Sequence, residues 1–143
     1  MTSVAFHFNA PNKIAYTCRL LRKAAASGSE VTVLGDSAML AKLDDQLWSF
    51  SALDFVPHGM FSSLSEQQHA LTPIWLCDAP EQGIGRQVLV NLTQQMPSAI
   101  ELFERVIEVV SQDDADRASA RARWKQYAAL GYEIVRHDLN LTV

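Results

Sequence analysis

The residues best suited to binding chemistry lie on one stretch near the C-terminus. Between positions 117 and 127 the chain carries four positive charges and no acid, although its formal net charge is -4. Arg117, Arg121 and Trp124 are spaced by four and by three, so they share one face of a helix. A guanidinium holds a carboxylate through paired hydrogen bonds, and an indole buries an apolar group. The pattern is typical of a receptor for a carboxylate attached to an apolar residue.

The same stretch has a second interpretation. It also fits an ordinary surface helix whose basic face is solvated and whose Trp124 and Tyr127 side chains pack in the core. Spacing alone leaves both interpretations open. For the receptor, we expect Val110, which ends the strand before this helix, to line the same hollow. Arg123 and Lys125 are expected to be simply solvated.

A second candidate surface lies between positions 47 and 60. Large apolar residues occur here without a helical or strand period. Exposed aromatic residues concentrate at interfaces, so the segment indicates a surface for a protein partner. The alternative is a loop tucked under the sheet as a satellite core. His58 follows Pro57, and its neighbours favour a surface contact over a catalytic base.

The sequence lacks the patterns of a nucleotide or metal enzyme. The first strand-to-helix turn, residues 8–12, contains Pro11 and no glycine, so it does not form a phosphate-binding loop. The pair Gly83 and Gly85 lacks a following helix and a phosphate-binding lysine. The four histidines share no metal-ligand spacing with each other or with a cysteine. We therefore expect no cofactor, no metal and no independent active site.

The elements that position these residues follow from apolar periodicity and from glycine and proline. Strands are predicted at 3–9, 30–34, 73–78, 87–92, 105–110 and 132–138, and helices at 11–27, 37–49 and 113–130. A short helical turn is expected within 97–103, and residues 52–70 are expected to be irregular. The alternation predicts a single α/β domain over residues 1–143, Rossmann-like, with a mainly parallel sheet and helices on both faces.

Composition bounds the class of protein further. The 143 residues are 48% hydrophobic and 20% charged, as expected for one globular domain. Cys18 and Cys77 lie in apolar runs and are expected to be buried thiols in a reducing compartment. No signal-peptide pattern opens the chain, and no apolar run approaches the ~20 residues that span a bilayer. We expect a cytoplasmic protein that does not bind membranes.

Two motifs in these stretches resemble a known family. One is Leu47-Trp48 followed by Phe55-Val56-Pro57-His58, and the other is the run from Ala120 to Tyr127, followed by Gly131 and Tyr132. With the length and the order of elements, they resemble the chi subunit of bacterial DNA polymerase III over nearly the whole chain. Arginine at 117 and tryptophan at 124 stand where the family can have lysine and tyrosine. Residues 61–72 match poorly, and no role is carried over to them.

The resemblance implies a non-catalytic clamp-loader accessory protein that has a Rossmann-like fold without a nucleotide site. It further implies two partners: the psi subunit, and the acidic, phenylalanine-ending C-terminal tail of single-stranded DNA-binding protein. By position, the tail pocket would consist of Val110, Arg117, Arg121 and Trp124. The psi contacts would be Trp48 and Phe55, with Val56, Pro57 and His58 shaping that surface.

Two rival functions remain at this stage. One is a nucleotide-dependent enzyme with a degenerate phosphate loop, against which the missing glycines weigh. The other is direct DNA binding through the basic helix, which the acidic net charge disfavours because phosphate contacts need a basic face. Under the adaptor hypothesis, contact with DNA is mostly indirect.

Overall fold

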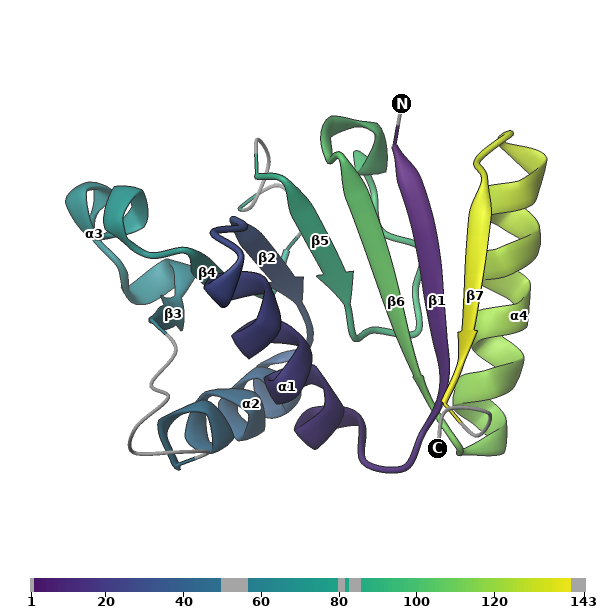
Figure 1. The fold of residues 1–143 in the computed structure, drawn as a ribbon, viewed down its shortest axis with the longest axis horizontal. Helices are drawn as coiled ribbons and strands as arrows, with labels where there is room; N and C mark the ends of the chain where they lie inside the picture. The colour runs from purple at the N-terminus through teal and green to yellow at the C-terminus, as the bar shows by residue number, and fades with distance from the viewer. Residues whose placement is uncertain (1, 50–56, 80–81, 83–85, 140–143) are drawn as a thin grey trace.

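A computed structural model describes residues 2–49, 57–79, 82 and 86–139 of the chain. Within them, seven parallel strands form one sheet in the order β3-β4-β2-β5-β6-β1-β7 (Figure 1). The strands are β1 (Ser3–Ala10), β2 (Val31–Leu34), β3 (His58–Met60), β4 (Ile74–Cys77), β5 (Val88–Asn91), β6 (Arg105–Ser111) and β7 (Ile134–Asp138).

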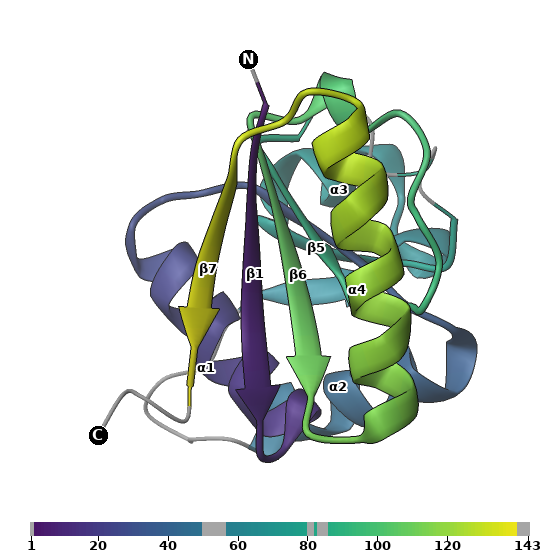
Figure 2. The same cartoon turned by 90° about the vertical axis from the view of Figure 1, so that its right-hand side faces the viewer.

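Helices cover both faces of this sheet. They are α1 (Lys13–Ala26), α2 (Ser37–Ser49), α3 (Glu66–Leu71) and α4 (Asp114–Ala129), with short 3-10 turns η1 (Phe61–Ser63) and η3 (Ile100–Leu102). The pair α1 and α2 packs on one face, and α4 runs along the other, in contact with β6 and β7 (Figures 1 and 2). The predicted Rossmann-like α/β fold with a parallel sheet is confirmed.

Two apolar clusters hold the layers together. β2 and β5 are buried along their whole length, which explains their near-continuous apolar sequences. Leu21, Leu43 and Leu47 pack from α1 and α2 onto one face of the sheet. Phe6 and Tyr127, both fully buried, belong to the cluster between α4 and the opposite face. Phe8 and Trp124 pack against this second cluster and are partly buried.

The ends of the two long helices follow from local sequence. Gly28 and Gly131 lie just beyond α1 and α4 with φ of 79° and 88°, the left-handed conformation that glycine adopts without a steric penalty. At the start of α4, the Asp113 side chain accepts a hydrogen bond from the Asp116 backbone N–H at 3.2 Å. These glycines end the helices where the sequence predicted.

Residues 57–70 are more regular than predicted. They contain the edge strand β3, the turn η1 and most of α3, which the sequence analysis treated as irregular. The three elements are short, and none of them has a fully buried residue, so they show no apolar period. A capping box between Ser65 and Gln68 fixes the start of α3. Phe55 and Val56 lie outside the described residues.

Both cysteines are buried free thiols, as expected. Burial raises the pKa of Cys18 to about 11 and that of Cys77 to about 12. Each thiol therefore stays protonated and unreactive at neutral pH. In the part of the chain that the structure describes, no helix has the length and apolar content needed to cross a bilayer.

The sheet face opposite α4 carries a partly buried histidine on β1. His7 Nδ1 shares a hydrogen bond with the Tyr16 hydroxyl, and its ring lies 4.7 Å from that of His137. Burial, together with the nearby His137 and Arg105, lowers the pKa of His7 to about 4. The unfolded chain therefore binds more protons than the folded one as the pH falls from ~6.5 toward 4, and stability is lost over that window.

The His7→Gln variant should lose less stability on acidification than the wild-type protein. As the pH falls from 7 to 5, the titration of His7 is expected to lower the free energy of unfolding of the wild-type protein by about 1 kcal/mol. This value is smaller than the full linkage effect of the pKa shift because His7 is partly exposed. Glutamine keeps a polar partner for Tyr16 but does not titrate. Urea unfolding at both pH values measures the difference. Equal acid losses in the two proteins would show that His7 is not the titrating group.

Candidate functional site

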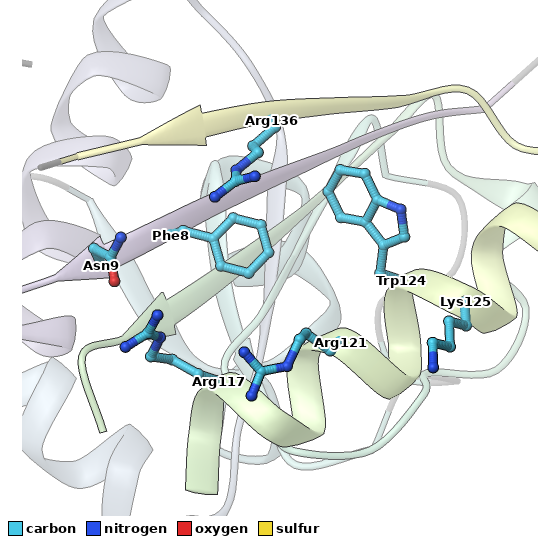
Figure 3. Close-up of a pocket in the computed structure, with 7 residues that line it drawn as sticks. All are labelled: Phe8, Asn9, Arg117, Arg121, Trp124, Lys125 and Arg136. Atoms are coloured by element: carbon cyan, nitrogen blue, oxygen red, sulfur yellow. The ribbon is translucent and has the colours of Figure 1, made fainter. Parts of the chain in front are cut away.

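A hollow of about 280 Å³ lies between α4 and the strands β1 and β7 (Figure 3). It is called the α4 pocket below, and it is lined by Phe8, Asn9, Arg117, Arg121, Trp124, Lys125 and Arg136. The structure thus brings together the three α4 residues selected by their spacing. The volume lies near the lower end for small-molecule sites, which suits one apolar side chain and an anionic group.

Aromatic rings form the apolar part of the α4 pocket. Phe6 is fully buried, stacks on Phe8 at 5.5 Å between ring centroids and lies 5.1 Å from Trp124. Trp124 is half-buried and also contacts Phe8 at 6.0 Å. The indole therefore packs on the core and faces the pocket at once, so the two interpretations of Trp124 are compatible. Tyr127 belongs entirely to the core.

The polar part of the α4 pocket is strongly cationic. The described residues that line it include three arginines and one lysine but no acidic side chain. Among the described residues, neither Arg117 nor Arg121 has a carboxylate within ion-pair distance. Both guanidinium groups extend from α4 toward the hollow beside Phe8 (Figure 3). An anionic ligand would relieve the repulsion between these cations and would receive paired hydrogen bonds.

An irregularity in β1 shapes one end of the pocket. The pairing of β1 with β6 shifts register between His7 and Ala10, and Asn9 adopts a left-handed φ of 66°. Asparagine tolerates this conformation better than most residues, and such bulges often redirect side chains near binding sites. The Asn9 side chain also donates a hydrogen bond to Asp138 at 2.8 Å. The bulge places Phe8 and Asn9 at the pocket wall.

A buried polar network fixes α4 to the sheet beneath the pocket. Glu108 on β6 is fully buried and accepts hydrogen bonds from Arg123 Nε at 3.2 Å and from the Tyr127 hydroxyl at 2.8 Å. The Asn91 amide donates to the same carboxylate at 3.0 Å. Arg123 Nη1 also donates to the Ser119 hydroxyl at 2.7 Å. The expectation that Arg123 is solvated is wrong, since only 2% of the residue is exposed.

The network places the charged groups of Glu108 and Arg123 in the protein interior. Burial raises the pKa of Glu108, and the charge of Arg123 opposes that rise together with the hydrogen bonds of Asn91 and Tyr127. Arg123 Nη2 has no hydrogen-bond partner among the described residues. A buried ion pair of this kind constrains the helix, because any movement of α4 leaves a charge without its partner. It therefore fixes which face of α4, the one carrying Arg121 and Trp124, is turned away from the sheet.

Val110 does not line the pocket, in contrast to the expectation. It is fully buried and belongs to the apolar cluster between the sheet and α4. Alternation along β6 places Val106, Glu108 and Val110 on the face that α4 covers, so Val110 lies underneath the helix. Phe8, which the sequence analysis did not select, supplies the apolar wall from β1.

The second candidate surface is only partly described. Trp48, at the end of α2, is 61% exposed, and Pro57 is exposed. His58 does not offer its ring to a partner, since its side chain has no exposed area and its Nε2 contacts Asp44 Oδ1 at 2.9 Å. The ring packs edge-on against Trp48 with centroids 5.4 Å apart. His58 thus supports Trp48 from beneath.

The usual nucleotide position of this fold is acidic. A crevice of about 600 Å³ opens at the carboxyl ends of the central strands, where open parallel sheets bind ligands. Among the described residues, it is lined by four aspartates, namely Asp36, Asp78, Asp113 and Asp116, and by a single cation, Lys13, which is paired with Asp116 at 3.2 Å. This charge balance repels phosphate. Among the described residues, no three potential ligands group into a metal site.

Fold and site together define a Rossmann-like α/β protein with a cationic, aromatic surface pocket. At the place where such folds commonly bind nucleotides, it has an acidic crevice. The family model of the DNA polymerase III chi subunit matches residues 1–135. The chain therefore belongs to the DNA polymerase III chi-subunit family.

Curated relatives agree with this assignment. A protein of Pseudomonas aeruginosa named DNA polymerase III subunit chi is 35% identical over 128 residues, which cover 89% of this chain and 87% of the relative. Proteins of the same name from Haemophilus influenzae and Escherichia coli are 30% and 24% identical, and each match covers 82% of this chain. The solved C-terminal domain of the DEAD-box protein Dbp5 has a TM-score of 0.60 at 14% identity, covering 96% of this chain and 91% of that domain. That likeness concerns the fold alone.

Proposed function

We propose that this chain is a non-catalytic replication adaptor that joins the clamp loader to single-stranded DNA-binding protein. The α4 pocket takes the acidic, phenylalanine-ending tail of that protein, and the surface around Trp48 takes psi. One observation carries the proposal: Arg117 and Arg121 lack carboxylate partners among the described residues and line one hollow with a half-buried indole. Membership in the chi-subunit family supports it.

In this proposal the tail binds by its very end. Arg121 and Arg117 hold the terminal carboxylate through charge-assisted hydrogen bonds. The terminal aromatic ring lies against Trp124 and Phe8, whose rings are already in contact at 6.0 Å. Because the pocket is partly exposed, the electrostatic part of the affinity should fall as salt rises.

The direct test compares full-length single-stranded DNA-binding protein with a version that lacks its last residues. The immobilised chain should retain the full-length protein and lose the truncated one. Equal retention of both would mean that another surface makes the contact. Retention of neither, by a chain that is folded, would remove the adaptor function proposed for this pocket.

The psi surface is a separate part of the proposal. Trp48 presents a large exposed aromatic group, and His58 supports it through its ring contact and its bond to Asp44. Exposed tryptophans of this kind are frequent hot spots in interfaces. Phe55 and Val56 are proposed partners of Trp48 in this surface, although both lie outside the described residues.

The Trp48→Ala variant should weaken psi binding by about thirty-fold or more, as expected for a hot-spot tryptophan. The side chain is mostly exposed, so the free energy of unfolding should change by no more than about 1 kcal/mol. Surface plasmon resonance with purified psi measures the first effect, and urea unfolding measures the second. Leu130→Ala is the control, because Leu130 is also a large exposed apolar residue (67%) but lies at the far end of α4. Wild-type affinity in Trp48→Ala would contradict the assignment.

Two rival functions make different predictions. A nucleotide-dependent enzyme would show a thermal shift with ATP or NAD. The aspartates in the crevice would repel the phosphates of either nucleotide, so we expect no shift. A DNA-binding module would bind single-stranded DNA without its partner. Titration of single-stranded DNA in the presence and absence of single-stranded DNA-binding protein separates direct from indirect contact.

A further inference from the structure

Arg136 is a second source of positive charge at the α4 pocket, and it comes from the opposite wall. It lies on the edge strand β7, next to Phe6 in the pairing with β1, and it lines the pocket with Arg117 and Arg121. The guanidinium carbon lies 5.3 Å from the centre of the Phe8 ring. In Figure 3 this ring lies between Arg136 on one side and the two α4 arginines on the other.

The existing contact of Arg136 is weak. Its Nη2 lies 3.6 Å from Asp138 Oδ2, beyond hydrogen-bond distance, and 64% of the side chain is exposed. Asp138 has a better partner, because its Oδ1 accepts a hydrogen bond from the Asn9 amide at 2.8 Å. An incoming anion therefore has to compete only with a loose, solvated ion pair. Asp138 keeps its bond to Asn9 when Arg136 moves away.

We propose that Arg136 is a specificity-determining residue that binds an acidic side chain of the ligand, upstream of the terminal carboxylate held by the α4 arginines. This inference rests on the proposed function of the pocket. Because the Phe8 ring lies between the cations of the two walls (Figure 3), the proposal assigns them to two different carboxylates of the ligand. The site thereby selects peptides that carry an acidic residue as well as an apolar, carboxylate-bearing end. Asp138 is the internal competitor that such a residue displaces.

The test is calorimetry with two synthetic peptides that end in phenylalanine with a free carboxylate. One carries acidic side chains before its terminal residue, and the other carries their amide counterparts. Arg136→Gln should bind the acidic peptide about two- to five-fold more weakly than the wild-type protein, a modest factor because the residue is exposed. It should bind the amide peptide as the wild-type protein does.

Two further variants separate ligand contact from a structural role. Asp138→Asn keeps an acceptor for Asn9 but removes the competing charge, so it should bind the acidic peptide about two-fold more tightly. If Arg136 and Asp138 only stabilise the end of β7, both variants should weaken binding. Arg19→Gln is the matched control, because it removes the same charge from an exposed position on α1.

Three results would overturn the inference. These are an Arg136→Gln affinity equal to that of Arg19→Gln, equal losses for the acidic and amide peptides, or weaker binding by Asp138→Asn. If the wild-type chain binds the acidic peptide and Arg136→Gln matches the control, this inference falls and the proposed function stands. If the folded wild-type chain binds neither peptide, the proposed function of the pocket falls as well.

Discussion

Replacing Arg121 by alanine should weaken the binding of an acidic, phenylalanine-ending peptide by about ten-fold or more. Hydrogen bonds to a charged group contribute roughly 1.5–3 kcal/mol each when they are well formed. The Arg121 side chain is exposed and is in no ion pair among the described residues, so its loss should leave the fold intact. Calorimetry measures the affinity, and circular dichroism with thermal unfolding verifies the fold.

Two controls sharpen the Arg121 experiment. Arg121→Lys keeps the charge but loses the planar fork, so its affinity should fall between those of the wild-type and alanine proteins. Arg19→Ala removes the same charge from α1 and should bind as the wild-type protein does. An unchanged affinity in a folded Arg121→Ala protein would contradict the pocket assignment.

Replacing Arg123, two positions along the same helix, should act on stability. Arg123→Met should lower the free energy of unfolding by about 3 kcal/mol, because it leaves the Glu108 carboxylate buried without its cation. Asn91 and Tyr127 still donate hydrogen bonds to Glu108, so we expect a value at the low end for broken buried pairs. Urea unfolding at neutral pH measures the loss.

The double variant Glu108→Gln with Arg123→Met distinguishes the ion pair from general packing. Removing both charges leaves no buried ion, so the pair of substitutions should cost less than the sum of the two single ones. Strictly additive losses would show that the two side chains are not coupled. A stability of Arg123→Met equal to that of Arg121→Ala would show that the buried network does not hold α4.

The framework of the fold was predictable because its elements carry strong local signals. Long apolar runs, such as that of β5, and the glycines after α1 and α4 mark strands and helix ends without tertiary information. The short elements β3 and α3 were missed because neither contains a fully buried residue. Their positions depend on pairing with β4 and on local capping, which apolar periodicity does not report.

Helix α4 shows why the site was only partly predictable. Two rows of residues at spacings of four and three are equally compatible with the sequence: Arg117, Arg121 and Trp124 face the pocket, and Asp116, Ala120, Arg123 and Tyr127 face the sheet. The buried row contains two charged residues, so hydrophobicity does not identify it. A signal was present in β6, because a glutamate inside an apolar strand needs a buried partner such as Arg123.

The opposite wall of the pocket carries no local signal. Phe8 and Arg136 are far apart in sequence and meet because β1 pairs with β7. Neither β1 nor β7 has an unusual composition, and the bulge at Asn9 is visible only in the register. Val110 is expected at the pocket because it ends the strand before α4, whereas strand alternation places it beneath the helix.

The most direct test of the central claim changes a single group on the ligand. A peptide with the acidic, phenylalanine-ending tail sequence is compared by calorimetry with the same peptide carrying a C-terminal amide. If the α4 pocket captures a terminal carboxylate, amidation should weaken binding about ten-fold or more in the wild-type protein and far less in Arg121→Ala. Equal affinities of the wild-type protein for the two peptides would contradict the account.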